Sequence, residues 1–364
     1  MKLNQKLGGI MCRASVHTHV LHAFCDVCGL SARDTHPIER RSTTAPGLFV
    51  TPIIELLRRQ ILSMVAGLLI AAMSATPCWA VDYQPFDFVP AAPGTIMIMG
   101  YSQYGTRNEL DNTITGTVKS GTHLESQIGI FRPLYYNQVF GHPYLLEFLL
   151  PFGTLYNGKI NGTRLNNSTG LGDLILSGTF WPISLPEQKT WFSVSNWVTV
   201  PSGTYHKGKP LNLGANRYQN DVQLNVTQGI GKKFTFDVSF DWIHYWDNTE
   251  AGTGHQTLSQ HDTYNVYNWV SYDISDVVRR ALPSLGAASV SVGYAGTFGG
   301  VQRLSGVRTG SKTSEHQIRF TYEQFVTPTW QALLSFNHDV KVSGQFKQNF
   351  GMVFRVAKVF SLGN

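Results

Sequence analysis

The chain has 364 residues, of which 14% are charged and 12% are aromatic, and it contains 35 Gly. The first 80 residues hold eight of its 29 Lys and Arg residues and four of its 23 Asp and Glu residues. Residues 81–364 therefore carry a net charge of only +2, which excludes the basic surface of a nucleic-acid-binding protein. Few charges, many aromatic residues and many glycines favour a β-protein with little water-exposed surface.

Residues 1–56 show no helix or strand periodicity, and they precede a segment that resembles an export signal. All four cysteines lie before residue 81, and Cys25 and Cys28 form a Cys-x-x-Cys pair near several histidines. A zinc site of this type normally needs a second pair, which does not follow, so we expect no metal. Because export signals normally begin at the N-terminus, residues 1–56 are predicted to be a mis-assigned extension that results from an upstream start codon.

Residues 57–80 have the three parts of a secretory signal peptide. Arg58 and Arg59 precede an apolar stretch at residues 61–75, and Ala80 ends a plausible cleavage site. The alternative is a transmembrane helix, but this stretch is shorter than the ~20 residues that cross a bilayer. We expect cleavage after Ala80, which leaves a mature chain without cysteine.

The mature chain is dominated by segments in which apolar and polar residues alternate. In residues 234–242, every second residue is Phe, Val or Trp, and the residues between them are Thr, Asp and Ser. This period of two is typical of a strand with two unlike faces. Twelve such strands are predicted, at residues 94–105, 119–132, 143–152, 171–182, 190–202, 215–229, 233–246, 263–274, 287–298, 314–326, 329–342 and 348–360. They are longer than the ~5–6 residues of ordinary strands and match the ~9–11 that cross a membrane.

The connections between these strands alternate in length. The predicted long ones are residues 106–118, 153–170, 203–214, 247–262 and 299–313. Short ones lie at 185–189, 231–233 and 327–328, although 133–142 and 275–286 break the rule, and residues 274–285 have a helix-like pattern. Outer-membrane barrels have an even number of strands, short periplasmic turns and long external loops. The predicted fold is therefore an all-β, antiparallel transmembrane barrel of about 12 strands at residues 81–364. A secreted two-sheet sandwich is the alternative, but its outer surface should carry more charge.

Residue parity predicts which face of each strand meets the lipid. Even-numbered positions are mostly apolar, so we expect them to face lipid, and Leu124, Ile128 and Ile130 are among them. Odd-numbered positions carry most of the charges and are expected to line the lumen, Glu125 and Gln127 included. A barrel must close on itself because unpaired backbone groups are costly in lipid.

Three short motifs resemble a known family. Residues 170–174 (GLGDL), 201–205 (PSGTY) and 211–218 (LNLGANRY) are similar to those of the outer-membrane transporters of the "meta-pathway of phenol degradation" (MetA-type) family. The resemblance runs from about residue 85 to the C-terminus. It implies a location in the outer membrane of a Gram-negative bacterium and a role in the uptake of hydrophobic or aromatic compounds, and it does not imply a catalytic site.

No catalytic motif or cofactor-binding fingerprint is present in the sequence, so we expect neither an enzyme nor a cofactor. The candidate residues instead line a solute path. On the strands and at the rim they are Asp173, Asp221, Asp237, Asp241, Arg319, Glu323 and Arg355. Tyr205 lies in the predicted external loop at residues 203–214, and Asn216 and Arg217 lie where the next strand begins. The alternative is that the loop residues only shape the rim of the barrel.

Two functions follow from these features. The first is a passive outer-membrane channel for small hydrophobic or aromatic compounds, and the second is a structural or interaction barrel with a packed lumen. Expected partners are the lipid bilayer, small hydrophobic solutes and the barrel-assembly machinery. That machinery commonly reads a C-terminal Phe, whereas here residues 361–364 follow Phe360.

Overall fold

The computed structural model of the protein describes residues 83–112, 116–309 and 312–361. All of these residues belong to the unit at residues 57–364. The predicted extension and signal peptide, at residues 1–80, lie outside the described residues. In the part of the chain that is described, no helix is long and apolar enough to cross a membrane.

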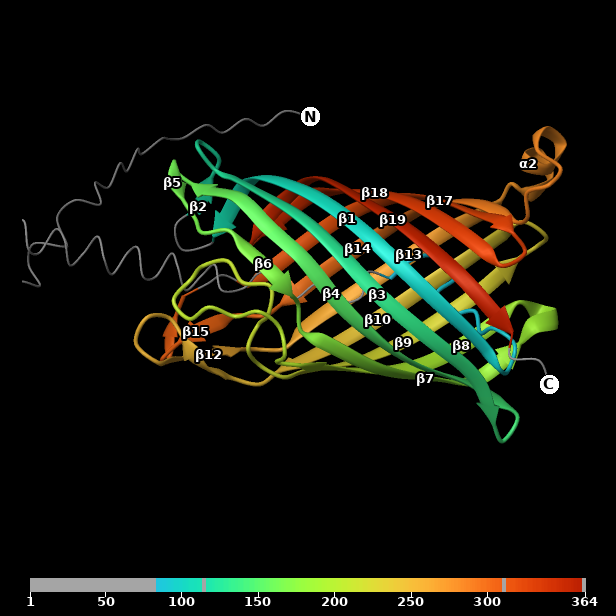
Figure 1. The fold of residues 1–364 in the computed structure, drawn as a ribbon, viewed down its shortest axis with the longest axis horizontal. Helices are drawn as coiled ribbons and strands as arrows, with labels where there is room; N and C mark the ends of the chain where they lie inside the picture. The colour runs from blue at the N-terminus through green and yellow to red at the C-terminus, as the bar shows by residue number, and fades with distance from the viewer. Residues whose placement is uncertain (1–82, 113–115, 310–311, 362–364) are drawn as a thin grey trace, which may run out of the picture. The chain divides into compact units, whose positions relative to one another are not determined.

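Twelve antiparallel strands form a closed barrel, which confirms the predicted fold class (Figure 1). Each strand pairs with its neighbours along the chain, and the last pairs with the first, as Ser361 with Thr95, so that the sheet has no open edge. The barrel strands are β1 (Thr95–Asn112), β3 (His123–Val139), β4 (His142–Ile160), β7 (Leu174–Leu185), β8 (Thr190–Val200), β9 (Gln219–Ile230), β10 (Phe234–Tyr245), β13 (Thr263–Asp273), β14 (Ala288–Gly299), β17 (Thr313–Thr327), β18 (Trp330–Ser343) and β19 (Phe346–Ser361).

Smaller elements lie in the connections and distinguish the two ends of the barrel. One end carries β2 (Gly116–Val118), β5 (Thr163–Arg164), β6 (Ser168–Leu171) and a separate four-stranded sheet of β11 (Asn248–Ala251), β12 (Gln256–Gln260), β15 (Gln302–Leu304) and β16 (Val307–Arg308). The other end carries the 3-10 turn η1 (Pro186–Gln188) and the helix α2 (Ser275–Ala281), which projects beyond the strands (Figure 1). The end with long connections is the extracellular one by the usual rule for such barrels.

Three predicted connections are wrong or too long. Residues 133–142 form no loop, because β3 and β4 meet in a tight turn at Phe140 and Gly141, whose φ angles are 51° and 79°. Positive φ at both central residues is typical of a two-residue hairpin. Pro133 and Pro143 each lie inside a strand, in β3 and β4. The predicted loops 106–118 and 153–170 also begin too early, because β1 and β4 continue to Asn112 and Ile160.

The predicted parity of faces holds on most barrel strands but is inverted on β3. Ile130 pairs with Tyr101 of β1 and with Pro151 of β4, so even positions of β3 meet odd positions of both neighbours. Directly paired residues share a face, so the even side of β3 turns inward. Leu124, Ile128 and Ile130 are accordingly buried in the lumen, whereas Gln127 faces outward. Glu125 also lies outside, where it accepts hydrogen bonds from Tyr104 and Asn157.

Candidate functional site

One wall of the lumen is apolar, and it is built mainly by β3, β4 and β7. The inverted parity of β3 turns a row of aliphatic side chains inward, and neighbouring strands add to it. These side chains are at most 5% exposed and belong to one buried cluster: Leu124, Ile128, Ile130, Leu134, Leu145, Leu149, Leu155 and Ile175. A barrel interior with an extended apolar wall differs from the polar, water-filled lumen of a general porin.

The adjoining wall is lined by small polar side chains from β8, β9 and β10, and β8 pairs directly with β7. Asn225 donates to the hydroxyls of Ser193 and Ser195, and Thr227 donates to Asp237 at 2.6 Å. These side chains are buried and bond mainly to one another. The lumen therefore has two unlike sides.

The segment before β1, residues 83–94, lies inside the barrel. Tyr83 and Phe88 are 2% and 3% exposed, and both belong to the apolar cluster of the lumen. The indole N–H of Trp181 donates to the carbonyl of Phe88 at 2.9 Å, which ties the segment to β7. No strand, helix or site residue was predicted at residues 83–93 from the sequence. The three prolines of the segment and its lack of alternation were the only signal that it does not pair as a strand.

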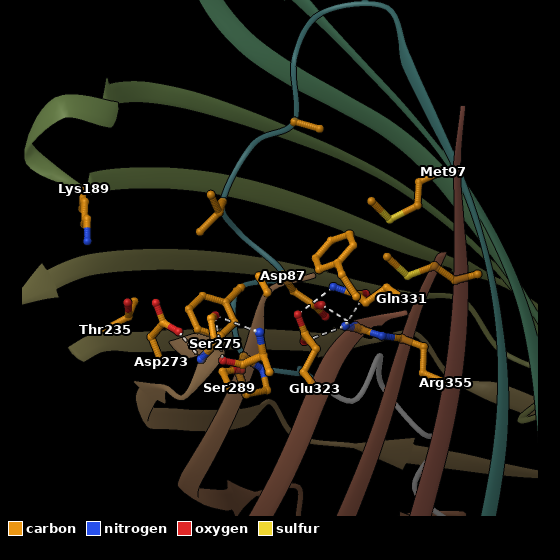
Figure 2. Close-up of a pocket in the computed structure, with 18 of the residues that line it drawn as sticks. Asp87, Met97, Lys189, Thr235, Asp273, Ser275, Ser289, Glu323, Gln331 and Arg355 are labelled. Atoms are coloured by element: carbon orange, nitrogen blue, oxygen red, sulfur yellow. Dashed lines mark hydrogen bonds and ion pairs between the residues drawn. The ribbon is translucent and has the colours of Figure 1, made fainter. Parts of the chain in front are cut away.

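Asp87 anchors this segment to two lumen arginines, as Figure 2 shows for Arg355. Asp87 Oδ1 lies 2.7 Å from Nη1 of Arg355, and Oδ2 lies 3.4 Å from Nη1 of Arg132. Glu147 binds Nε of Arg132 at 2.6 Å, and Glu323 binds Nη2 of Arg355 at 3.2 Å. Two guanidinium groups and three carboxylates thus form one buried network, in which paired charges offset the cost of burial.

The six predicted strand residues all lie on the lumen side, but they divide into separate groups. Glu323 and Arg355 join the network around Asp87. Asp237 and Asp241 lie on the polar wall, where Ser239 donates to Asp241 at 2.9 Å. Asp221 is nearby on β9, and one of its carboxylate oxygens is buried without a partner among the described residues. Arg319 donates to Gln317 and lies over the ring of Tyr267 at 5.4 Å.

The other predicted residues shape the extracellular mouth. Asp173, which precedes β7, accepts the backbone N–H groups of Gly203 and Ala215 at 2.8 and 2.7 Å. It therefore pins both ends of the loop at residues 201–218 to the barrel. The middle of this loop turns inward, because Leu211 is fully buried and exchanges hydrogen bonds with the side chain of Asn166.

Tyr205, Asn216 and Arg217 join this loop to the neighbouring loop that carries the four-stranded sheet. Tyr205 donates to the carbonyl of Glu250 at 3.2 Å, and Asn216 donates to Asn248 at 3.0 Å. Arg217 donates to Gln260 and lies over the ring of Tyr245 at 4.6 Å. These contacts support the reading that the three residues shape the rim.

Glu250 is a second link between the same two loops. Lys207 and His255 lie 3.0 and 2.8 Å from its carboxylate, and these hydrogen bonds hold the pKa of Glu250 below its ordinary value. The carboxylate is largely exposed, so the contribution of these pairs to stability is small.

The described residues include no group of three or more His, Cys, Asp or Glu side chains that is arranged to hold a metal ion. A His–Asp pair does occur outside the barrel near its extracellular end. Asp262 accepts from Trp242 and lies 2.8 Å from Nδ1 of His244. The ring of His244 packs against Trp246, which is the arrangement of an interfacial aromatic cluster.

A sequence family described as "Putative MetA-pathway of phenol degradation" matches residues 107–356. The chain belongs to this family. The COG4313 outer membrane channel from Pseudomonas putida F1 is 26% identical, has a TM-score of 0.70, and is matched over 77% of this chain and 100% of that one. The protein is therefore a barrel of the outer membrane of a Gram-negative bacterium, as its sequence predicted.

Two more distant structures share only the barrel architecture. The beta domain of the Bordetella autotransporter BrkA is 6% identical, with a TM-score of 0.44 over 74% of this chain and 100% of that one. The TodX monoaromatic hydrocarbon channel is 9% identical, with a TM-score of 0.38 over 74% and 91%. Neither is similar enough to bear on function. No curated protein matches the chain.

Proposed function

We propose that this protein is a passive outer-membrane channel for small hydrophobic or aromatic compounds and that it is not an enzyme. The apolar wall inside the barrel carries the proposal. Aliphatic side chains such as Ile128 and Leu149 face the lumen, whereas a channel for hydrophilic solutes has a polar lumen. An apolar solute can replace its contacts with water by contacts with this wall.

A cavity favours this function over that of a structural barrel with a packed lumen. It has a volume of about 360 Å³ and lies between the segment at residues 83–94 and the barrel wall. Figure 2 shows its lining from Met97 on β1 to Lys189 near the periplasmic turn. The volume is at the lower end of the range of ligand sites, ~300–1,000 Å³, which suits a small solute.

The family and the related channel structure support the same function. In this proposal the solute follows the apolar wall, and the loop at residues 201–218 and the segment at residues 83–94 control its passage at the two ends. The aspartates of the polar wall hold the barrel side chains in place and do not perform chemistry.

Uptake by intact cells tests the proposal, because hydrophobic solutes cross a plain phospholipid bilayer without help. A radiolabelled aromatic hydrocarbon is supplied to cells that lack their own channel for it, with or without this protein. We expect faster uptake in cells that carry the barrel in assembled form. Equal uptake in both would contradict the proposal and favour the structural alternative.

A further inference from the structure

The carboxylate of Asp87 occupies a site that is built from groups of the barrel wall. Arg132 on β3 and Arg355 on β19 both present a guanidinium nitrogen to it, and their side chains are only 2% and 3% exposed. Asp87 itself belongs to the inserted segment, which forms no strand ladder with the wall. The wall supplies the two donors, and the inserted segment supplies the acceptor.

Each of the two arginines keeps one glutamate partner when Asp87 leaves the site. Arg132 keeps Glu147 as a partner at Nε, and Arg355 keeps Glu323 at Nη2. The Nη1 atom of Arg355, however, loses the 2.7 Å contact to Asp87, and a buried guanidinium without its acceptor is unfavourable. The site therefore favours a state in which one additional carboxylate is bound.

The wall also holds a spare donor for such a group. Nε of Arg355 is buried and has no hydrogen-bond partner among the described residues. Even with Asp87 bound, this N–H group of the guanidinium has no acceptor among the described residues. Arginine binds a carboxylate best through two parallel N–H groups, which a free acid can approach more closely than a side chain held by its backbone.

The cavity next to this site has room for an apolar body. Arg132, Arg355 and Asp87 line it together with Met97, Met99 and Leu134. Figure 2 shows Met97 across the cavity from the cluster of Asp87, Glu323 and Arg355. Charged donors at one side and flexible apolar side chains at the other suit a small amphiphilic anion.

We propose that Arg132 and Arg355 form a lumen binding site for the carboxylate of a small acid with an apolar body, of the arenecarboxylate class. Asp87 occupies this site when no solute is present. The carboxylate of a solute acid replaces the carboxylate of Asp87 at the two arginines. The segment at residues 83–94 is then released from the wall. This inference rests on the proposed function, because it names one class of solute for the same lumen.

A neutral solute of the same size cannot make this exchange. Benzamide has the shape of benzoate but offers a single neutral acceptor, so it leaves the arginines less well paired than Asp87 does. The site therefore predicts discrimination between two isosteric aromatic compounds by charge.

Calorimetric titration of benzoate and benzamide into the purified barrel tests the site. Removing the competing carboxylate by Asp87→Ala should strengthen benzoate binding by roughly tenfold or more relative to the wild type. Adding Arg355→Gln to that variant should abolish the gain, and benzamide should bind none of the three proteins measurably. Asp262→Asn, which changes an acid outside the barrel, should bind benzoate as the wild type does.

Binding of benzoate to Asp87→Ala that is no tighter than to the wild type would overturn the proposal, as would equal binding of benzamide. If Asp87→Ala does not assemble, amide hydrogen exchange of the wild type decides. Saturating benzoate should speed exchange in residues 83–94, and benzamide should not; no difference between the two would overturn the proposal. If the site fails these tests while the cells still take up neutral hydrocarbons, the proposed channel function stands without it.

Discussion

Asp87 and Arg355 are 268 positions apart in the chain, yet Oδ1 of one lies 2.7 Å from Nη1 of the other inside the barrel. This pair joins the segment before the first strand to the last strand. The closure of the barrel between β1 and β19 makes the contact possible, because it brings both ends of the sheet around the same lumen. The segment at residues 83–94 is consequently part of the packed interior of the barrel.

Deletion of residues 83–92 should open the lumen from the periplasmic side. The segment contributes the buried rings of Tyr83 and Phe88 and the carboxylate of Asp87, and no barrel strand depends on it for pairing. We expect a higher single-channel conductance in planar bilayers, with heat-modifiable migration on gels retained. An unchanged conductance in correctly assembled protein would show that the segment does not obstruct the path.

The sequence was sufficient to predict the barrel because period-two alternation repeats over twelve segments. It could not predict which face of β3 turns toward the lumen. The even positions Leu124, Ile128 and Ile130 are apolar, and the odd positions include Glu125 and Gln127. By composition alone the aliphatic face belongs in lipid. Register with β1 and β4 decides otherwise, and register depends on pairings that one sequence does not display.

On most strands, the sequence predicted which polar residues line the lumen, but it did not predict which groups they contact. Glu323 and Arg355 were both candidates, yet Asp87, the second carboxylate that Arg355 binds, lies in a segment without alternation, where no pattern singled it out. Likewise, Asp173 was recognised beside glycines, but the backbone groups that it binds, at Gly203 and Ala215, depend on how a long loop folds back.

Cysteine labelling tests the orientation of β3. Residues 81–364 contain no cysteine, so a single thiol introduced there is the only one in that part of the chain. Phe131, 41% exposed, should point to lipid, whereas Ile130, 5% exposed, should point to the lumen. A membrane-soluble maleimide should therefore modify Phe131→Cys much faster than Ile130→Cys. The opposite order would restore the orientation that composition suggested.

Asp173→Ala should release the loop at residues 201–218. Its carboxylate accepts two backbone N–H groups, and hydrogen bonds to a charged acceptor contribute about 1.5–3 kcal/mol each. Limited proteolysis of the assembled protein should then cut within the loop faster than in the wild type. Asp262→Asn, which affects an acid outside the lumen, serves as the control and should leave the cleavage rate unchanged.

Phe240→Arg should impair assembly of the barrel. Phe240 lies near the middle of β10 and is 43% exposed on the outer face, where an Arg at mid-membrane costs about 2–4 kcal/mol. The matched variant Phe140→Arg changes a side chain that is 96% exposed in the β3–β4 turn and should be tolerated. The fraction of heat-modifiable protein in membranes measures both, and equal fractions would place Phe240 outside the lipid.

Hydrocarbon uptake by cells that carry Leu149→Asn tests most directly whether solutes follow the apolar wall. Leu149 is 1% exposed on β4, and an amide of similar size makes the wall polar without filling the lumen. At equal levels of assembled protein, uptake should fall by roughly tenfold, the effect of about 1.4 kcal/mol on the path. Ser195→Ala, on the polar wall, should leave uptake near the wild-type rate. Uptake that is unaffected by Leu149→Asn, or equally reduced by both changes, would contradict a path along the apolar wall.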